Sequence, residues 1–247
     1  MKTFYNGKKI LITGHTGFKG AWLSFWLTQL GADVCGIALA PSTSPSLYDA
    51  LNLDSLLKSY IQDIYDYDAI KAIINDEKPD IVFHLAAQPL VRLSYDIPIE
   101  TIKTNILGTA NVFDILRNTP SVKVCINVTS DKCYLNSGNG MQFKESDSLG
   151  GSDIYSASKA CSEILTDAYR SSFFSHSDCK LCLASARAGN VIGGGDWSKD
   201  RLIPDFIRAI QSNEVIQLRY PNAVRPWQHV LDPLSGYLLL AEKLWSS

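Results

Sequence analysis

Side chains that could carry out proton chemistry gather where one predicted strand ends. The apolar run 122–128 is followed by Thr129, Ser130, Asp131 and Lys132. Folding seldom requires a hydroxyl, a carboxylate and an amine at the end of a buried strand. Groups of these types can bind a hydroxyl and move protons to and from it. We therefore predict a catalytic site at this strand end.

Tyr155 and Lys159 form a second candidate pair, at the start of a predicted helix over 155–169. A spacing of four residues places both side chains on one helix face. A cation beside a phenol favours the phenolate and lowers the phenol pKa from about 10 towards working pH. Tyr155 could therefore serve as a general base. Taken alone, such a pair is more often a chance surface pair, which many helices contain.

A glycine loop with Gly14, Gly17 and Gly20 directly follows the predicted strand 9–12. Glycines let the backbone turn tightly and approach a pyrophosphate, which the N–H groups at the start of the next helix would bind. The loop predicts a dinucleotide site, with an ordinary glycine-rich turn as the alternative. Residues 39–42, after the second strand, include neither an acid for a ribose nor a base for a 2′-phosphate, which favours NAD over NADP.

Short β-branched runs alternate with longer segments of helical period, which is typical of a parallel sheet with crossover helices. We predict strands at residues 9–12, 34–39, 60–61, 80–85, 122–128 and 180–186, and helices at 17–30, 68–75, 99–116 and 155–169. The fold class is α/β, a doubly wound parallel Rossmann sheet with its site at the carboxyl ends of the strands.

The pattern loosens after residue 188. It continues with a glycine run at 193–195, a short helix at 201–210, a strand-like segment at 215–218 and a closing helix at 232–244. We therefore expect a Rossmann domain over 1–188 and a partial substrate-binding lobe over 189–247.

Composition limits the classes of partner. Of 247 residues, 46% are hydrophobic, and 25 acidic side chains oppose 23 basic ones for a formal charge of −2. No basic excess is available to bind a phosphate backbone, which argues against nucleic acid. The apolar run 10–12 is too short for a signal peptide or a membrane span. We expect neither a nucleic-acid nor a membrane partner.

Six cysteines lie mostly in apolar runs, as buried thiols in a reducing compartment would, so we expect a cytoplasmic protein. They are Cys35, Cys125, Cys133, Cys161, Cys179 and Cys182. The last two have the C-x-x-C form of a zinc or redox site, but no second pair or histidine cluster accompanies them. No metal site is predicted.

The glycine loop, the hydroxyl-bearing strand end and the Tyr-x-x-x-Lys helix occur in an order that resembles the extended short-chain dehydrogenase/reductase superfamily, over nearly the whole chain. Within it, five stretches look like the CDP-glucose 4,6-dehydratase family: 14–20, 86–95, 129–134, 187–197 and 225–230. The related dTDP-glucose dehydratases carry Asp-Glu where this chain has Asp131-Lys132. That difference is the most diagnostic feature.

The resemblance implies a lyase that acts on CDP-glucose through an internal redox cycle with NAD. Tyr155 would take the proton of the sugar 4-hydroxyl while hydride leaves C4, and Ser130 and Lys159 would hold that hydroxyl and the cofactor ribose. Water then leaves across C5 and C6, and hydride returns to C6. Asp131 would protonate the departing 6-hydroxyl. Lys132 would be either the base at C5 or a stabiliser of the enolate.

Particular residues are implied at each ligand. Those expected at the cofactor are Gly14, Thr16, Gly17, Phe18, Lys19, Gly20, Asp63, Ile64, Leu85, Ala86, Ala87, Gln88, Thr104, Tyr155 and Lys159. Those expected at the substrate are Gln88, Asn190, Arg201 and Arg225, the arginines because a guanidinium binds phosphate oxygens in pairs.

The resemblance also implies a homo-oligomer, because helices 99–116 and 155–169 match those of a dimer bundle in relatives. It further implies a longer chain whose additional C-terminal elements complete the sugar-nucleotide pocket.

Two other functions remain open. One is another nucleotide-sugar enzyme on this scaffold, either an epimerase or a dTDP- or GDP-sugar dehydratase. Asp131 and Lys132 favour a dehydratase over an epimerase, which has no need to eliminate water. The other is a non-catalytic NAD-binding protein, a class that usually lacks the Tyr-x-x-x-Lys pair present here.

Overall fold

A six-stranded parallel sheet forms the centre of the computed structural model, which describes residues 1–138, 140–175, 179–218 and 220–246. The strand order is β3-β2-β1-β4-β5-β6. The strands are β1 (Lys9–Thr13), β2 (Asp33–Ala38), β3 (Lys58–Ile61), β4 (Ile81–His84), β5 (Val124–Val128) and β6 (Cys182–Ala186). This order confirms the predicted doubly wound α/β sheet.

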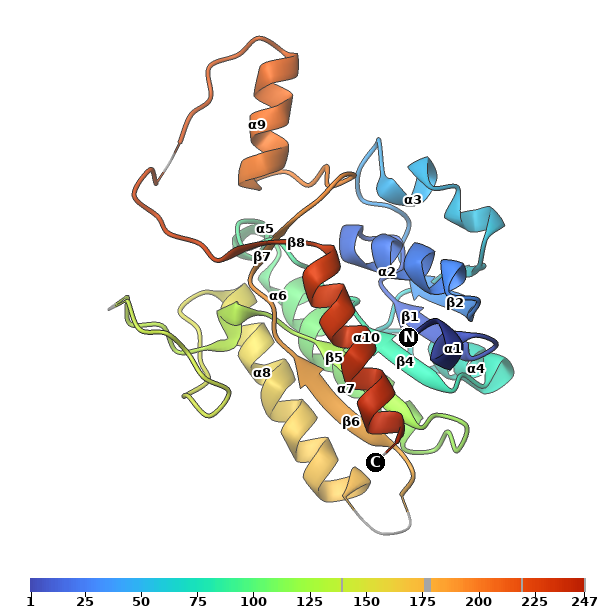
Figure 1. Ribbon diagram of the computed structural model, residues 1–247. Coiled ribbons are helices and arrows are strands. Elements are labelled where there is room, and N and C mark those ends of the chain that lie inside the picture. The colour runs from blue at the N-terminus through green and yellow to red at the C-terminus, as the bar shows by residue number, and fades with distance from the viewer. Residues whose placement is uncertain (139, 176–178, 219, 247) are drawn as a thin grey trace.

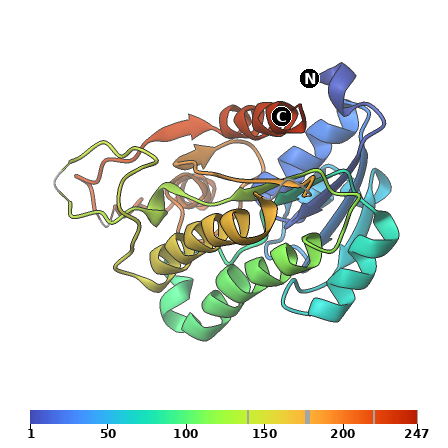
Figure 2. The same cartoon turned by 90° about the horizontal axis from the view of Figure 1, so that it is seen from below.

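Helices cover both faces of the sheet. The central strands carry apolar residues at successive positions, so the side chains on both faces must be buried. In β1, Ile10 and Ile12 pack into one core and Leu11 packs into the other. Helices α2 (Phe18–Gln29) and α10 (Leu231–Trp245) cover the first face. Helices α4 (Tyr67–Glu77), α7 (Thr109–Leu116) and α8 (Ile154–Tyr169) cover the second. Figure 2 shows α8 in yellow and α7 in green on one side of the sheet, with α10 in red on the other.

Shorter elements connect this framework. They are α1 (Lys2–Tyr5), α3 (Leu47–Ala50), η1 (Leu53–Ser55), α5 (Leu93–Asp96), η3 (Asp131–Cys133) and η4 (Arg170–Phe174). Within the described ranges, no helix has both the length and the hydropathy needed to cross a membrane.

The predicted helix 99–116 is interrupted in the structure. Helix α6 (Pro98–Ile102) passes into a π-helical turn, η2 (Lys103–Gly108), before α7 begins. At Gly108 the turn lies so close to Ile64 that an added Cβ would come within 2.6 Å of the Ile64 side chain. A π-turn of this kind often marks a functional position, because it redirects side chains within a helix.

The segment after residue 188 is arranged differently from the prediction. Residues 215–218 form no strand, so that prediction is wrong; Val215 is 88% exposed and has no neighbouring strand to pair with. Instead β7 (Asn190–Ile192) and β8 (Trp227–His229) pair as a small parallel ladder, and α9 (Leu202–Gln211) projects from the body (Figure 1). Helix α10 packs on the sheet within the first core.

Candidate active site

The glycine loop between β1 and α2 is shaped by contacts that exclude a side chain. Gly14 has φ +81°, and an added Cβ would lie 2.8 Å from the Ala86 backbone nitrogen. A Cβ at Gly20 would lie 2.0 Å from the Gly14 carbonyl oxygen. Gly17 is the N-cap of α2, so the first N–H groups of that helix, which have no partner within the helix, lie at the carboxyl edge of the sheet. This cradle fits the pyrophosphate of a dinucleotide, as the glycine spacing predicts.

We expect Gly20→Ala to destabilise the chain by about 3 kcal/mol, because the new methyl group meets backbone atoms that cannot move without reshaping the loop. Chemical denaturation of the unliganded protein would measure the loss. Gly236→Ala is the matched control: it lies in α10 with nothing within 4 Å of an added Cβ, and alanine favours a helix. Equal stability of the two variants would contradict the close approach at Gly20.

A buried polar chain fixes the strand ends beside this cradle. The Thr13 hydroxyl lies 2.7 Å from His84 Nδ1 and accepts a hydrogen bond from the Ala86 N–H at 3.2 Å. His84 Nε2 lies 3.0 Å from the Thr109 hydroxyl. Burial, followed by the charge of Lys159, lowers the His84 pKa to about 3, so the imidazole is neutral. The sequence analysis missed this series of hydrogen bonds. Its signal in the sequence is that a polar residue, Thr13 or His84, ends each of two buried strands.

Asn105 in the π-turn is a second polar residue that the sequence analysis missed. Its amide nitrogen donates to the Gln88 carbonyl at 3.1 Å and to the Ser158 hydroxyl at 2.9 Å. Gln88, predicted at both cofactor and substrate, has its side-chain amide engaged internally: it donates to Leu90 O and to the Thr101 hydroxyl and accepts from Leu90 N. The structure therefore gives the Gln88 side chain a role in holding the loop after β4.

Asp63 and Ile64, which were predicted to meet the adenine, follow the end of β3, and Thr16 and Thr104 are two further predicted cofactor residues. Asp63 accepts a hydrogen bond from the Tyr65 N–H at 2.9 Å, while Ile64 is buried against Gly108. The Thr16 hydroxyl donates to the Leu39 carbonyl at 2.8 Å, which ties the glycine loop to the end of β2. Thr104 is half-buried in the π-turn.

Ser130, Asp131 and Tyr155 converge at the end of β5. The Ser130 hydroxyl donates to Asp131 Oδ1 at 3.0 Å and accepts from the Lys132 N–H at 3.2 Å. Burial raises the Tyr155 pKa, and the nearby Ser130 hydroxyl and the Arg201 charge oppose that rise. Arg201 is thus a cation near Tyr155 that the spacing does not predict.

Three cations, Lys159, Lys19 and Arg201, lie near this strand end: Lys19 interacts electrostatically with both of the others and with Asp131. Lys159 is 6% exposed, and its Nζ donates to the Val128 carbonyl at 3.3 Å. Burial and the neighbouring Lys19 charge lower the Lys159 pKa to about 8. Burial and Arg201 lower the Lys19 pKa to about 8, while Asp131 opposes this. Arg201 pairs with Asp196 at 3.0 Å. This excess of positive charge suits an anionic ligand such as a diphosphate.

The lysine pair makes stability depend on pH. Below pH about 8 both amines are charged in the folded chain, so the full cost of burying them is present. Between pH 8 and the ordinary value of 10.5 the unfolded chain binds more protons, so stability rises with pH. We expect Lys19→Met to stabilise the unliganded protein by about 1 kcal/mol at pH 7, with the gain shrinking at pH 9.5. Denaturation at both pH values would measure this.

Lys2→Met, in the exposed α1, is the control and is expected to change stability equally little at both pH values. A Lys19→Met gain that did not depend on pH would contradict the cost assigned to burying the charged Lys19 amine.

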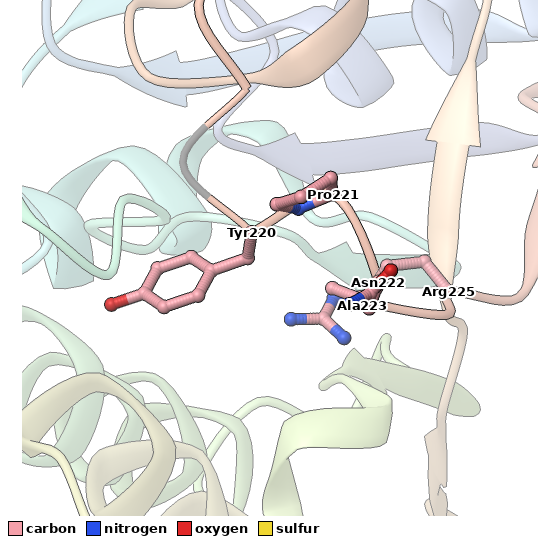
Figure 3. Close-up of a pocket in the computed structure, with 5 residues that line it drawn as sticks. All are labelled: Tyr220, Pro221, Asn222, Ala223 and Arg225. Carbon is pink, nitrogen blue, oxygen red and sulfur yellow. The ribbon is translucent and has the colours of Figure 1, made fainter.

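The remaining predicted substrate residues lie farther along the C-terminal segment. Asn190 begins β7 and pairs in register with Trp227. Arg225 is exposed, and its guanidinium donates to the Val224 carbonyl at 2.8 Å. Figure 3 shows Arg225 in a hollow lined by Tyr220, Pro221, Asn222 and Ala223. None of these residues belongs to the cluster around Tyr155, so the structure does not bring Arg225 to that cluster.

A buried ion pair between Glu163 and Arg187 lies beside the end of β5. Glu163, one helical turn after Lys159, accepts from Arg187 at 2.9 Å, from Ser185 at 2.7 Å and from the Thr129 hydroxyl. Arg187 also lies over the Tyr134 ring, 4.8 Å from its centroid. Glu163 and Arg187 are separated in the sequence by 24 residues, and no spacing pattern predicts their contact.

The fold and the residues gathered at the carboxyl edge are those of a dinucleotide-dependent enzyme of the short-chain type. The chain belongs to the NAD dependent epimerase/dehydratase family, whose model matches residues 10–246. NAD, the cofactor predicted from the glycine loop and the end of β2, is the cofactor of this family.

Two relatives are similar along most of the chain. CDP-glucose 4,6-dehydratase of Salmonella typhimurium is 50% identical over 248 residues, covering 99% of this chain and 69% of the relative. dTDP-D-glucose 4,6-dehydratase of Dictyostelium discoideum is 32% identical over 252 residues, covering 96% of this chain and 56% of the relative.

Solved structures show the same fold. UDP-glucose 4-epimerase of Thermotoga maritima, solved with UDP-glucose, has a TM-score of 0.83 at 24% identity and covers 95% of this chain and 73% of its own. dTDP-glucose 4,6-dehydratase of Bacillus anthracis, solved with NAD, has a TM-score of 0.80 at 20% identity and covers 96% and 72%.

Proposed function

We propose that this chain converts CDP-glucose to CDP-4-dehydro-6-deoxy-glucose and water. The observation that carries the proposal is its 50% identity, over 99% of its length, to a CDP-glucose 4,6-dehydratase. The cluster of Ser130, Asp131 and Tyr155 supports it, because the reaction needs a base for the 4-hydroxyl proton and, near it, an acid for the departing 6-hydroxyl.

NAD, when bound, supplies the acceptor and later the donor of a hydride. The N–H groups at the start of α2 and the Gly14–Gly20 cradle are suited to its pyrophosphate. Tyr155 takes the proton from the sugar 4-hydroxyl. Asp131 gives a proton to the departing 6-hydroxyl, and Lys132, which follows it in η3, is the proposed base at C5.

Arg201 and Asn190 are proposed to hold the diphosphate of the substrate, with Arg225 reaching it from the loop before β8. Support for Arg201 is its electrostatic interaction with Tyr155 and Lys19. A guanidinium already oriented by Asp196 can bind two phosphate oxygens at once.

Three further proposals complete this account. The dinucleotide domain comprises residues 1–188 together with α10, because α10 packs in the first core. The protein is a homo-oligomer; the support for this proposal is that the apolar side chains of Ile99, Leu107 and Ile164, in α6, η2 and α8, are exposed. It works in the cytoplasm, supported by six free cysteines.

The test compares CDP-, dTDP-, UDP- and GDP-glucose side by side with the purified chain and NAD. We expect CDP-glucose to give a 4-keto-6-deoxy product, seen as alkali-induced absorbance, with no net change in reduced cofactor. Preferred turnover of another nucleotide would overturn the base assignment. A 4-epimer without loss of water would favour an epimerase.

A further inference from the structure

The buried carboxylate of Glu163 joins helix α8 to the two strands that end at the candidate site. Its side chain is 4% exposed and pairs with Arg187 at 2.9 Å. It also accepts hydrogen bonds from the hydroxyls of Thr129, which follows β5, and of Ser185, which belongs to β6. Three donors from two neighbouring strand ends therefore meet at one carboxylate on the helix that covers them.

The Glu163 carboxylate is ionised. Burial raises its pKa, but the hydrogen bonds from Arg187, Thr129 and Ser185 outweigh burial and hold that pKa below its ordinary value. Hydrogen bonds to a charged acceptor are stronger than those between neutral groups. The loss of a donor would also leave a buried charge less well satisfied, which is costly. This set of contacts therefore restrains the two strand ends.

The same contacts reach both sides of η3, the turn that carries Asp131. Thr129 comes two residues before Asp131 in the chain. The Asp131 N–H donates at 3.2 Å to the carbonyl of Ala188, which directly follows Arg187. The Arg187 guanidinium also lies 4.8 Å from the ring centroid of Tyr134, the C-cap of η3. The turn is thus held before Asp131, at Asp131 and after it.

We propose that Glu163 and Arg187 are positioning residues for the elimination of water: their ion pair fixes η3, and with it Asp131 and Lys132. The inference rests on the proposed function, which gives those two residues of η3 their roles. Glu163 and Arg187 act through the turn and not by contact with the substrate. Tyr155 is carried by α8 and not by η3, so loosening the turn should slow elimination more than oxidation of C4.

The test removes both charges at once. Arg187→Met alone would leave the Glu163 carboxylate buried without its cation, which can unfold a chain. The double variant Glu163→Gln with Arg187→Met keeps side chains of similar size and leaves no unpaired buried charge, so we expect it to fold. Its matched control is Glu77→Gln with Lys58→Met. That variant removes another ion pair of a buried carboxylate, 3.0 Å long, beside β3 at the opposite edge of the sheet.

Thiol labelling reports on η3 without substrate or NAD. Cys133 is the last residue of η3 and is fully buried, and Cys125 is equally buried in β5. In the double variant we expect N-ethylmaleimide, followed by mass spectrometry of each peptide, to label Cys133 about tenfold faster and Cys125 at an unchanged rate. Equal acceleration at both cysteines would show a general loss of stability, and no acceleration at Cys133 would show that the pair does not hold the turn. Either result would overturn the proposal.

A change in thiol ionisation does not imitate this result. Burial raises the Cys133 pKa to about 11, and the Arg187 charge lowers it more than the Glu163 charge raises it. Removing both charges therefore leaves the thiol less ionised and, by that effect alone, slower to react. Faster labelling of Cys133 in the double variant reports the opening of η3.

The second readout is the absorbance of reduced NAD during turnover of whichever of CDP-, dTDP-, UDP- and GDP-glucose the unchanged protein prefers. The double variant is expected to lose about 10²-fold in kcat, because displaced groups catalyse poorly. Reduced cofactor should accumulate, because oxidation of C4 is then faster than the loss of water. The Glu77 control should keep kcat within about twofold, without accumulation. Loss of kcat without accumulated reduced cofactor would overturn the role in elimination.

The two readouts separate this inference from the proposed function. If the unchanged protein dehydrates none of the four nucleotide-sugars while Cys133 is labelled as expected, the proposed function fails and the restraint of η3 by the ion pair stands. If a nucleotide-sugar is dehydrated while labelling of Cys133 is not accelerated in the double variant, the function stands and the positioning role is wrong.

Discussion

Tyr155→Phe is expected to lower kcat by about 10³-fold while NAD binds with unchanged affinity. The phenol is the group that takes the 4-hydroxyl proton, and losing a positioned general base costs about 10²- to 10⁴-fold in rate. Phenylalanine keeps the ring and its buried contacts, so the fold should be retained. Steady-state turnover of CDP-glucose and a separate titration of NAD, followed by tryptophan fluorescence, would measure the two quantities.

Tyr169→Phe is the matched control for this variant. Tyr169 lies on the same helix, α8, with its ring 5.5 Å from Phe113 and away from the catalytic cluster. We expect Tyr169→Phe to keep kcat within about twofold, because it removes no group of the site. If Tyr155→Phe also kept its activity, the assignment of Tyr155 as the base would be wrong.

Asp131→Asn is expected to lower overall turnover by about 10²- to 10⁴-fold, because the amide cannot protonate the departing 6-hydroxyl. It is close in shape to the carboxylate and does not lie in the glycine cradle, so NAD affinity should change little. Product formation and NAD binding, measured on the same preparation, would separate the two effects.

Asp167→Asn serves as its control, since Asp167 is 69% exposed on α8 and pairs there with Arg170. Exposed pairs contribute little to stability, and we expect unchanged turnover. Loss of NAD binding in Asp131→Asn would contradict the role given to Asp131, because it would place that carboxylate in cofactor binding.

Most of the sheet could be predicted because its central strands are short apolar runs bounded by polar residues, whereas the edge strand β3 is more polar. The C-terminal segment could not. Residues 215–218 are mostly apolar, like a strand, yet a strand needs a neighbour, and Val215 has none among the residues that the structure describes. The π-turn at 103–108 was not predicted either, and its close approach of Gly108 to Ile64 joins segments that are distant in the sequence.

The sequence predicts which residues lie at the candidate site better than it predicts which other residues they interact with. Ser130, Asp131 and Tyr155 were predicted from residue types at strand and helix ends, and the structure brings them together. The interaction of Arg201 with Tyr155 depends on the path of the chain after β7, which periodicity does not encode. For the same reason, the placement of Lys19 beside Asp131 could not be predicted from the glycine loop that contains it.

The most direct test of the internal redox cycle follows one labelled hydrogen. CDP-glucose carrying deuterium at C4 is incubated with the protein and NAD, and the product is examined by mass spectrometry and NMR. The account predicts a 4-keto-6-deoxy sugar with that deuterium in its C6 methyl group. A product whose C6 carries no deuterium from C4, or no loss of water from CDP-glucose at all, would contradict it.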